Sequence, residues 1–309
     1  MITQILDDFD LEKIAESGQC FRWEKIDDAI ENDSCSPVNK QEAEKRKSIT
    51  DITNHPCTYR ILADNTCLYI NELDAGQGLY ELDCSEEDFS NFWHRYFDLG
   101  ENYRCIRERI DRAQDPFLWE AAEQEKGIRI LRQDPWEMLI TFIISQNKNI
   151  PGIRRCVEYL AQSCGKKKTD SRGIPYYSFP TPQQLASLSE EALADCRLGY
   201  RCKYVKAAAE AVLTEKINLE ELITADEKSA MKSLTALYGV GTKVANCVSL
   251  FGLHHVNAFP IDVWVKRILA QEYPDGYPRD QYSPYNGIYQ QYMFAYYRQR
   301  ATRKDEIRN

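Results

Sequence analysis

The stretch LYGVGTKVANCVSLFGLHHVNAFPID, residues 237–262, contains a tight turn between two helical patterns. The turn carries Gly239 and Gly241, and the helix after it spaces its apolar residues as one buried helix face. These apolar residues are Val244, Cys247, Val248 and Phe251. The helix before the turn has Thr224 and Glu227 at the spacing of a capping box, so we expect Thr224 to cap it. Two helices joined by so short a turn form a compact hairpin.

The turn is suited to binding a phosphate. Gly239 can end the first helix in a left-handed conformation at little steric cost. The N–H groups of the turn and the N-terminus of the second helix, next to Gly241, form a favourable site for an anion. Both glycines also let the backbone of a ligand come close. Taken alone, the same turn is also compatible with a helical corner that binds nothing.

Two polar residues flank this turn. Lys243 lies at the start of the second helix, where a primary amine beside an anion site and a cleft can act as a nucleophile. A lone lysine at such a position is also typical of solvated surface. Asp262 precedes a third helical pattern, and its simplest role is that of an N-cap.

Composition indicates a globular protein of two or three domains. The chain has 309 residues, of which 43% are hydrophobic, enough for a full core. Its 11 cysteines include no C-x-x-C pair, which favours reduced thiols over a disulfide framework. The N-terminus lacks the order of a signal peptide, and no apolar run is long enough to span a bilayer. We therefore expect an intracellular protein without membrane contact.

Charge is divided unequally along the chain. The formal net charge is −9, which argues against a protein that coats nucleic acid by bulk charge. Residues 241–309 contain nine lysines and arginines against six aspartates and glutamates, so residues 1–240 carry −12. A local phosphate-binding face near the hairpin is therefore compatible with the acidic composition.

Up to about residue 110 the pattern indicates antiparallel strands. Residues 19–23 form one strand candidate, and residues 59–63 and 66–73 flank Asp64-Asn65, a plausible hairpin turn. Residues 25–56 are polar with little periodicity, so we expect a solvated loop or a frayed helix there.

From about Asp111 to the end the pattern is helical. Residues 134–137, Asp-Pro-Trp-Glu, combine an N-cap, a proline at the first helical position and an acid at the third. An aromatic helix is expected over about residues 285–300. We predict an α+β fold, with an antiparallel sheet domain over 1–110 and a larger helical domain over 111–309 that has a cleft between helical lobes.

Six separated stretches resemble the 8-oxoguanine DNA glycosylase branch of the helix-hairpin-helix-GPD DNA glycosylases. They are SGQCFRW (17–23), YFDL (96–99), RILRQDPWE with SQNKNI (129–137, 145–150), LGYR (198–201), the hairpin with its aspartate (237–262) and QQYMF (290–294). Each match is weak, but six in the family's order are specific. The resemblance implies a TBP-like N-terminal sheet domain before an all-α domain, and excision of 8-oxoguanine in base-excision repair.

The resemblance also implies a covalent mechanism. Lys243 matches the family's nucleophile, whose amine attacks the sugar C1′, expels the base and leaves a Schiff base that permits β-elimination and strand nicking. A free lysine is almost wholly protonated at neutral pH, so burial, a neighbouring cation or a proton acceptor must favour the neutral amine. Asp262 matches the acid that stabilises positive charge on the sugar and assists proton transfer.

The damaged base must leave the duplex and enter a pocket. By the same resemblance, Gly18 offers its carbonyl to N7, which bears a hydrogen in 8-oxoguanine and a lone pair in guanine. Cys247 and Phe294 match the residues that sandwich the base, and Gln290 matches one that bonds its Watson–Crick edge. Without the resemblance, Gly18 is equally compatible with a turn that enters a strand, and Cys247 and Phe294 are equally compatible with ordinary core positions.

Further matches concern the rest of the duplex. Asn147 matches the residue that fills the space left by the flipped base, and Tyr200 matches a wedge beside the opposite base. Arg201 matches one of two arginines that read the unpaired cytosine. Gly239 and Gly241 are expected to contact phosphate.

The chain departs from the family's pattern in two places. The second cytosine-reading arginine falls on Gly152, although Arg154 is close by in sequence and could compensate. A phosphate-contacting histidine of the animal members falls on Trp264, and its acidic partner falls on Tyr297, so Trp264 occupies a DNA-binding position with different chemistry. Both changes favour a bacterial member, located in the cytoplasm or nucleoid, with a relaxed preference for the opposite base.

The resemblance implies no cofactor. No cysteine follows Cys247, so the four-cysteine iron–sulfur cluster of some related glycosylases cannot form, whereas a structural cation at 239–241 is possible. The expected partner is double-stranded DNA containing 8-oxoguanine, bound by a monomer. Two alternatives stay open: an alkyl-base glycosylase that uses water, which Lys243 disfavours, and a DNA-binding module without activity.

Overall fold

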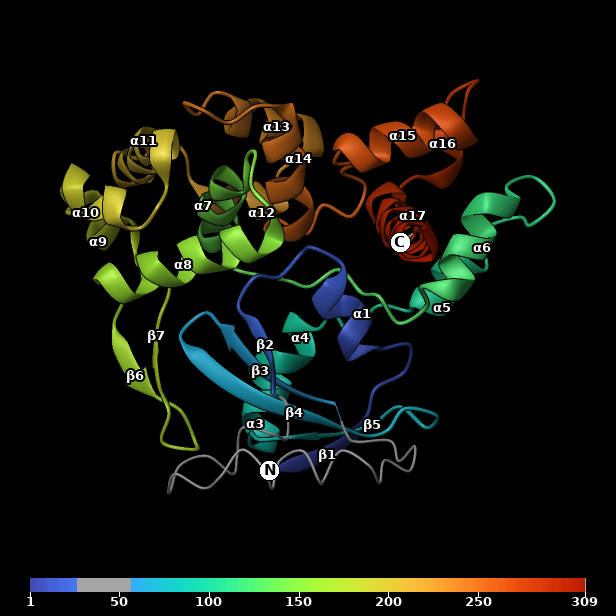
Figure 1. The fold of residues 1–309 in the computed structure, drawn as a ribbon, viewed down its shortest axis with the longest axis horizontal. Helices are drawn as coiled ribbons and strands as arrows, with labels where there is room; N and C mark the ends of the chain where they lie inside the picture. The colour runs from blue at the N-terminus through green and yellow to red at the C-terminus, as the bar shows by residue number, and fades with distance from the viewer. Residues whose placement is uncertain (27–56, 309) are drawn as a thin grey trace.

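The computed structural model describes residues 1–26 and 57–308. They form an antiparallel sheet, at the bottom of Figure 1, and a larger helical part above it. The polar stretch predicted over residues 25–56 lies almost entirely outside the described residues. Within the two described ranges, every helix is too short or too polar to cross a membrane.

The sheet has five antiparallel strands in the order β1-β5-β4-β3-β2. They are β1 (Ile2–Ile5), β2 (Trp23–Ile26), β3 (Thr58–Ala63), β4 (Thr66–Asp74) and β5 (Leu79–Leu82). The predicted β3–β4 hairpin is confirmed, and Asp64 in its turn adopts a φ of 51°. The strand predicted over residues 19–23 is wrong in position, because β2 begins only at Trp23.

A short helical segment packs on the sheet and completes its core. It consists of α3 (Glu86–Asp88), the π-helical turn η2 (Phe89–Trp93) and α4 (His94–Tyr96), and α1 (Leu11–Glu16) joins the same core. The rings of Trp93 and Phe97 stack at 5.7 Å between centroids, and both side chains are buried. Aromatic burial of this kind is the main stabilising contribution available to so small a sheet.

The helical part has its own, larger hydrophobic core. Its elements are α5 (Tyr103–Arg107), α6 (Pro116–Gln124), α7 (Pro135–Ser145), α8 (Ile150–Cys164), α9 (Pro182–Ala186), α10 (Glu190–Asp195), η3 (Gly199–Arg201), α11 (Cys202–Leu213), α12 (Leu219–Thr224), α13 (Glu227–Thr235), α14 (Thr242–Phe251), α15 (Val263–Glu272), α16 (Arg279–Tyr282) and α17 (Asn286–Arg308). Helix α7 is central and packs against α8, α11 and α14. It begins as predicted, with the Asp134 carboxylate accepting from the N–H of Glu137 at 2.6 Å.

The prediction that the chain stays helical after Asp111 is wrong at one place. Strands β6 (Lys167–Thr169) and β7 (Pro175–Tyr177) form a two-stranded hairpin after α8. The reason is local, because Gly173 adopts a φ of 80° in the turn and a proline follows two residues later. The hairpin reaches down to the sheet (Figure 1), where Asp170 binds the guanidinium of Arg60 at 2.8 Å.

Gln19 explains why its segment is not a strand. Its side chain donates to the carbonyl of Arg129 and accepts from the N–H of Leu131, both at 2.8 Å. Its own carbonyl accepts from the side chain of Gln133 at 2.9 Å. These buried bonds fix the loop at residues 17–20 against the connection between the two parts. The domain boundary at residues 110 and 111 stays a prediction, and Leu131 packs into the sheet's core.

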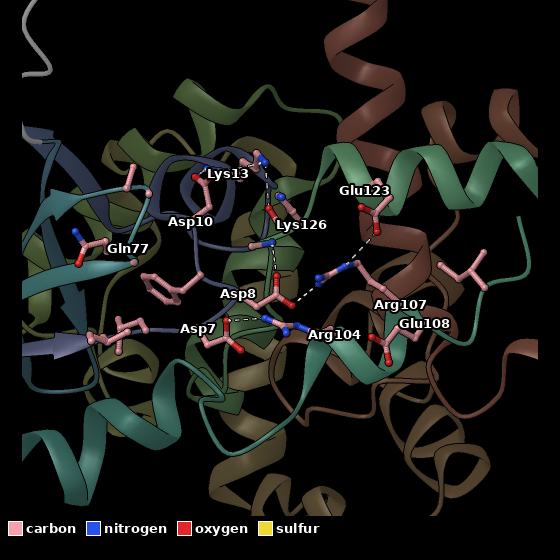
Figure 2. Close-up of a pocket in the computed structure, with 18 of the residues that line it drawn as sticks. Asp7, Asp8, Asp10, Lys13, Gln77, Arg104, Arg107, Glu108, Glu123 and Lys126 are labelled. Carbon is pink, nitrogen blue, oxygen red and sulfur yellow. Dashed lines mark hydrogen bonds and ion pairs between the residues drawn. The ribbon is translucent and has the colours of Figure 1, made fainter.

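A cleft of about 680 Å³ opens between the two parts (Figure 2), and no residue of the predicted hairpin site lines it. Its charged side chains pair with one another, Arg107 with Asp8 and Arg104 with Asp7 (Figure 2). The residues that line it belong to none of the six matched stretches. The cleft therefore presents mostly neutralised charge to a ligand.

Candidate active site

The hairpin predicted from the sequence is formed by α13 and α14. Gly239 adopts a φ of 83°, and a Cβ at this position would lie 2.2 Å from Cγ of Tyr204. Backbone conformation and packing therefore both require glycine. Gly241 caps α14 at an open position, where a Cβ would meet no atom within 4 Å. The space beside the N-terminus of α14 is thus accessible to an anion.

The first helix of the hairpin begins later than predicted. Asp226, not Thr224, is its N-cap and accepts from the N–H of Ser229 at 3.0 Å. Thr224 ends α12, with its hydroxyl donating to the carbonyl of Glu221. Threonine and aspartate are both effective N-caps, so spacing alone could not distinguish the two starts.

Helix α14 carries the predicted nucleophile on its first turn. Lys243 is half-buried, and its Nζ lies 5.6 Å from the centre of the Phe142 ring on α7. Cys247, one turn later, is 3% exposed. Burial raises the pKa of the Cys247 thiol, and the positive charge of Lys243 opposes that rise. The amine and the thiol therefore share one face of the helix.

Asp262 caps α15, as its position in the sequence predicts. Its Oδ1 accepts from the N–H of Val265 at 2.8 Å. Its negative charge also adds to the rise in the pKa of the Cys247 thiol, after the larger contribution of burial. Lys243, Cys247 and Asp262 thus lie in one neighbourhood.

Gly18 and Phe294 meet although they are far apart in the sequence. Gly18 adopts a φ of 80°, and a Cβ there would lie 3.7 Å from Cε1 of Phe294. Phe294 is half-buried on α17, one turn after the buried Gln290. The side-chain carbonyl of Gln290 accepts from the amide of Gln291 at 2.9 Å. A loop and a ring therefore lie side by side, as a base pocket requires, while their contacts with a base stay predictions.

The residues matched to the opposite strand lie on exposed segments. Asn147 is exposed between α7 and α8 with a φ of 52°, a conformation that asparagine tolerates. Tyr200 is 51% exposed in η3. The side-chain amide of Gln146 donates to the carbonyl of Gly239 at 3.1 Å, which connects the Asn147 loop to the hairpin.

Arg201 is buried and bound to the protein's own backbone. It is 5% exposed, and its Nε donates to the carbonyl of Gln146 at 2.8 Å. Its Nη2 donates to the carbonyl of Asn147 at 3.3 Å. In this conformation the guanidinium supports the Asn147 loop, and contact with a cytosine stays a prediction.

Gly152 stands where the family has its second arginine, and Arg154 follows two residues later on α8. Arg154 lies one turn before Glu158 on α8, and Glu158 binds the guanidinium of Arg22 at 2.7 Å. Burial raises the pKa of the Cys20 thiol to about 12 although the positive charge of Arg154 opposes this rise. Arg154 is thus close enough to Cys20 for its charge to act on the thiol, and its compensation for Gly152 stays a prediction.

Trp264 and Tyr297, the second departure from the family's pattern, touch each other. Their ring centroids lie 6.3 Å apart in an edge-to-face arrangement. The guanidinium carbon of Arg267 lies 5.1 Å from the centre of the Trp264 ring. The Tyr297 hydroxyl donates to the side chain of Gln271 at 2.7 Å. An aromatic contact therefore replaces a polar pair at the start of α15.

Sequence reasoning missed a group of residues beside the hairpin. The Tyr204 ring packs against Tyr200 and Tyr238, with centroids at 5.9 and 5.0 Å. The Nζ of Lys203 lies 5.4 Å from the centre of the Tyr204 ring. The i, i+4 spacing of Tyr200 and Tyr204 is a usable sequence signal. The contact of Tyr204 with Tyr238 joins separate elements and has no such signal.

Metal binding has no side-chain basis in residues 1–26 and 57–308. Within these ranges, no three histidine, cysteine, aspartate or glutamate side chains are grouped as metal ligands. A cation held by backbone carbonyls at residues 239–241 stays a prediction.

Both parts of the chain match known protein families. Residues 1–139 match the N-terminal domain of 8-oxoguanine DNA glycosylase, and residues 140–275 match the HhH-GPD superfamily of base excision DNA repair proteins. The N-glycosylase/DNA lyase of Saccharomyces cerevisiae is 35% identical over 205 residues, which are 62% of this chain. That match spans about half of the yeast protein, 54% of its length.

Two solved structures are similar over nearly the whole chain. MBOgg1 in complex with a low-affinity DNA ligand gives a TM-score of 0.80 at 35% identity, over 95% of this chain and 93% of that one. The Clostridium acetobutylicum 8-oxoguanine glycosylase/lyase, in complex with double-stranded DNA containing cytosine opposite 8-oxoguanine, gives 0.79 at 30% identity, over 95% and 93%. With both domains matched in order and this similarity across the chain, the protein belongs to the 8-oxoguanine DNA glycosylase family.

Proposed function

We propose that this protein is a bifunctional DNA glycosylase and abasic-site lyase that excises 8-oxoguanine from duplex DNA. One observation carries the proposal: the amine of Lys243, at an accessible helix N-terminus, shares one neighbourhood with Cys247 and Asp262. A half-buried amine on the first turn of a helix, with a buried thiol one turn later, is a candidate nucleophile, whereas a DNA-binding module needs only phosphate contacts. Family membership adds independent support.

The reaction follows from the chemistry of these groups. The lone pair of the neutral Lys243 amine forms a bond to C1′, and the glycosidic electron pair leaves with the base, which takes up a proton. Opening of the sugar ring then gives an imine between Lys243 and C1′. Loss of a proton from C2′ expels the 3′ phosphate and nicks the strand. Asp262 stabilises the positive charge that develops on the sugar, and the chemistry requires no cofactor.

Lesion recognition rests on the Gly18 loop. Because Gln19 fixes this loop through three buried bonds, the Gly18 backbone has little freedom to move. A rigid carbonyl oxygen accepts a hydrogen bond from the N7 hydrogen of 8-oxoguanine, whereas it is repelled by the N7 lone pair of guanine. Cys247 and Phe294 provide the faces of the base pocket, and Gln290 provides its polar end.

The opposite base is recognised less strictly. Gly152 removes one cytosine-reading side chain, and Arg201 is engaged with backbone carbonyls. We propose that a monomer binds the duplex through the hairpin and through Tyr200 and Asn147. Excision rates should therefore differ little between cytosine and other partners.

Borohydride trapping tests the proposed function. The protein is mixed with a labelled duplex holding one 8-oxoguanine, borohydride is added, and a covalent protein–DNA band is sought, with Lys243→Gln alongside. We expect a band that disappears in the variant. Base release without a band indicates hydrolysis by water, as in an alkyl-base glycosylase, and contradicts the proposal. Tight binding of the duplex without release of the base indicates a DNA-binding module without activity and also contradicts the proposal.

A further inference from the structure

A second surface lies beside the hairpin and is not explained by the excision chemistry. We call it the hairpin patch, and it consists of Lys203, Tyr204 and Tyr238. Lys203 is exposed on α11, and Tyr238 is 57% exposed directly before Gly239. Helices α11, α13 and α14 lie along the top of Figure 1, and the Tyr204 ring of α11 packs against Gly239 in the turn before α14.

Two aromatic rings hold the lysine of the hairpin patch. Its Nζ lies 5.4 Å from the centre of the Tyr204 ring and 5.7 Å from that of Tyr238. The two rings meet edge to face at 5.0 Å. Tyr204 is itself held, because its ring occupies the space that a side chain at Gly239 would need. The amine is therefore pre-positioned next to the hairpin turn.

The lysine also keeps its charge available. Within the described residues, no carboxylate lies at ion-pair distance from Lys203. A lysine amine is protonated at neutral pH at its ordinary pKa, and the neighbouring Tyr238 raises the pKa of Lys203 further. An exposed, oriented cation without a protein counter-charge is suited to an external anion.

We propose that Lys203, held by Tyr204 and Tyr238, binds a backbone phosphate of duplex DNA adjacent to the phosphate at the hairpin turn. The hairpin patch adjoins the hairpin turn, which is proposed to bind DNA, so we assign DNA as its ligand. This assignment rests on the proposed function. The protein carries a net charge of −9, so bulk attraction is not available and local cations must supply the phosphate contacts.

The proposal separates DNA affinity from chemistry. A phosphate contact carries no sequence information and lies outside the reacting atoms, so its loss weakens binding to damaged and undamaged duplex alike. Loss of one phosphate contact lowers the slope of log Kd against log salt by about 0.9. The excision rate constant at saturating protein stays unchanged.

The test measures Kd for an undamaged duplex by fluorescence anisotropy at several salt concentrations. We expect Lys203→Ala to weaken binding about fivefold at low salt and to lower the salt slope by about 0.9. Lys203→Arg retains both values, and Tyr238→Ala weakens binding about twofold because the lysine is no longer held. Lys126→Ala, which removes an exposed charge in the cleft of Figure 2, is the matched control and changes neither value.

Single-turnover excision of 8-oxoguanine at saturating protein completes the test. Equal Kd and slope for Lys203→Ala and the parent overturn the proposal, as does an equal loss in Lys126→Ala, which indicates bulk charge alone. A lower rate constant with unchanged Kd also overturns it. If the parent protein binds DNA but excises nothing, the proposed function fails, while the salt slopes still decide on the phosphate contact.

Discussion

The two sides of the candidate site are built in different ways. The lesion side is assembled from buried or half-buried groups on helices and on a loop that Gln19 fixes, namely Gly18, Lys243, Cys247, Asp262 and Phe294. Each predicted contact with the damaged nucleotide requires one protein atom to be held in a defined position. This side is therefore suited to distinguishing one base from a close analogue.

The opposite-base side is more open. Asn147 and Tyr200 are exposed, Gly152 has no side chain, and Arg201 is turned toward backbone carbonyls. Among these four residues, only Arg201 has its polar group bound to the protein in the hydrogen bonds described above. From this difference we propose that selectivity for the damaged base and selectivity for its partner are separable within one fold, and the following changes test that separation.

The largest effect is expected from Asp262→Asn. The variant loses the negative charge that stabilises the sugar, so single-turnover excision should fall by about 10² to 10³, roughly 3–4 kcal/mol in the barrier. Asparagine is as good an N-cap as aspartate, so the melting temperature should change little. Asp226→Asn, at the cap of α13, is the matched control and should keep full activity. Activity within threefold of the parent in Asp262→Asn would contradict the catalytic role.

Gly239→Ala should have the next largest effect, because it disturbs the hairpin that supports both sides. A side chain there has an unfavourable φ and meets the Tyr204 ring, so the free energy of unfolding should fall by about 2 kcal/mol. Gly241→Ala has an ordinary φ of −89° and open space, and should cost less than about 1 kcal/mol. Thermal unfolding measures the stability of both variants. Equal losses in the free energy of unfolding would contradict the different roles assigned to Gly239 and Gly241.

Gly18→Ala tests the lesion side alone. A Cβ fits beside Phe294, but the φ of 80° strains an alanine, and relief of that strain shifts the carbonyl. We expect about tenfold slower excision of 8-oxoguanine, or about 1.4 kcal/mol. Gly173→Ala shares the φ of 80° in the remote β6–β7 turn and should retain full activity. An unchanged excision rate in Gly18→Ala would contradict the proposal that the Gly18 carbonyl recognises N7.

The smallest effect is expected on the opposite-base side. Gly152→Arg restores a side chain that can reach the partner base, and should raise the preference for cytosine by up to about tenfold. Because a Cβ at Gly152 lies 2.8 Å from the Asn149 cap, Gly152→Ala controls for disturbance of the helix start. Excision rates opposite cytosine and adenine measure the change, and equal ratios in the two variants would show that the arginine adds nothing.

Local signals explain what the sequence predicted correctly. The β3–β4 hairpin, the Asp134 cap, the Gly239 turn and the Asp262 cap each depend on a few adjacent residues whose conformational preferences are strong. The order of elements and the two-part fold followed from the change in periodicity. Residues matched by resemblance were placed correctly where they lie on such elements, as Lys243 and Cys247 do on α14.

The features that were missed depend on contacts distant in sequence. Gln19 was assigned to a strand because its bonds to residues 129–133 leave no local pattern. Arg201 faces inward because two carbonyls at the end of α7 accept its guanidinium, which no spacing predicts. The fit of Tyr204 against Gly239 likewise becomes visible only when the two helices are placed together.

The most direct test of the separation is a set of single-turnover excision rates for 8-oxoguanine opposite cytosine, adenine, guanine and thymine, with undamaged guanine as a fifth substrate. We predict rates within about tenfold for the four partners, a difference of less than about 1.4 kcal/mol, and no excision of guanine. A preference for cytosine of more than tenfold, or removal of undamaged guanine, would contradict the account.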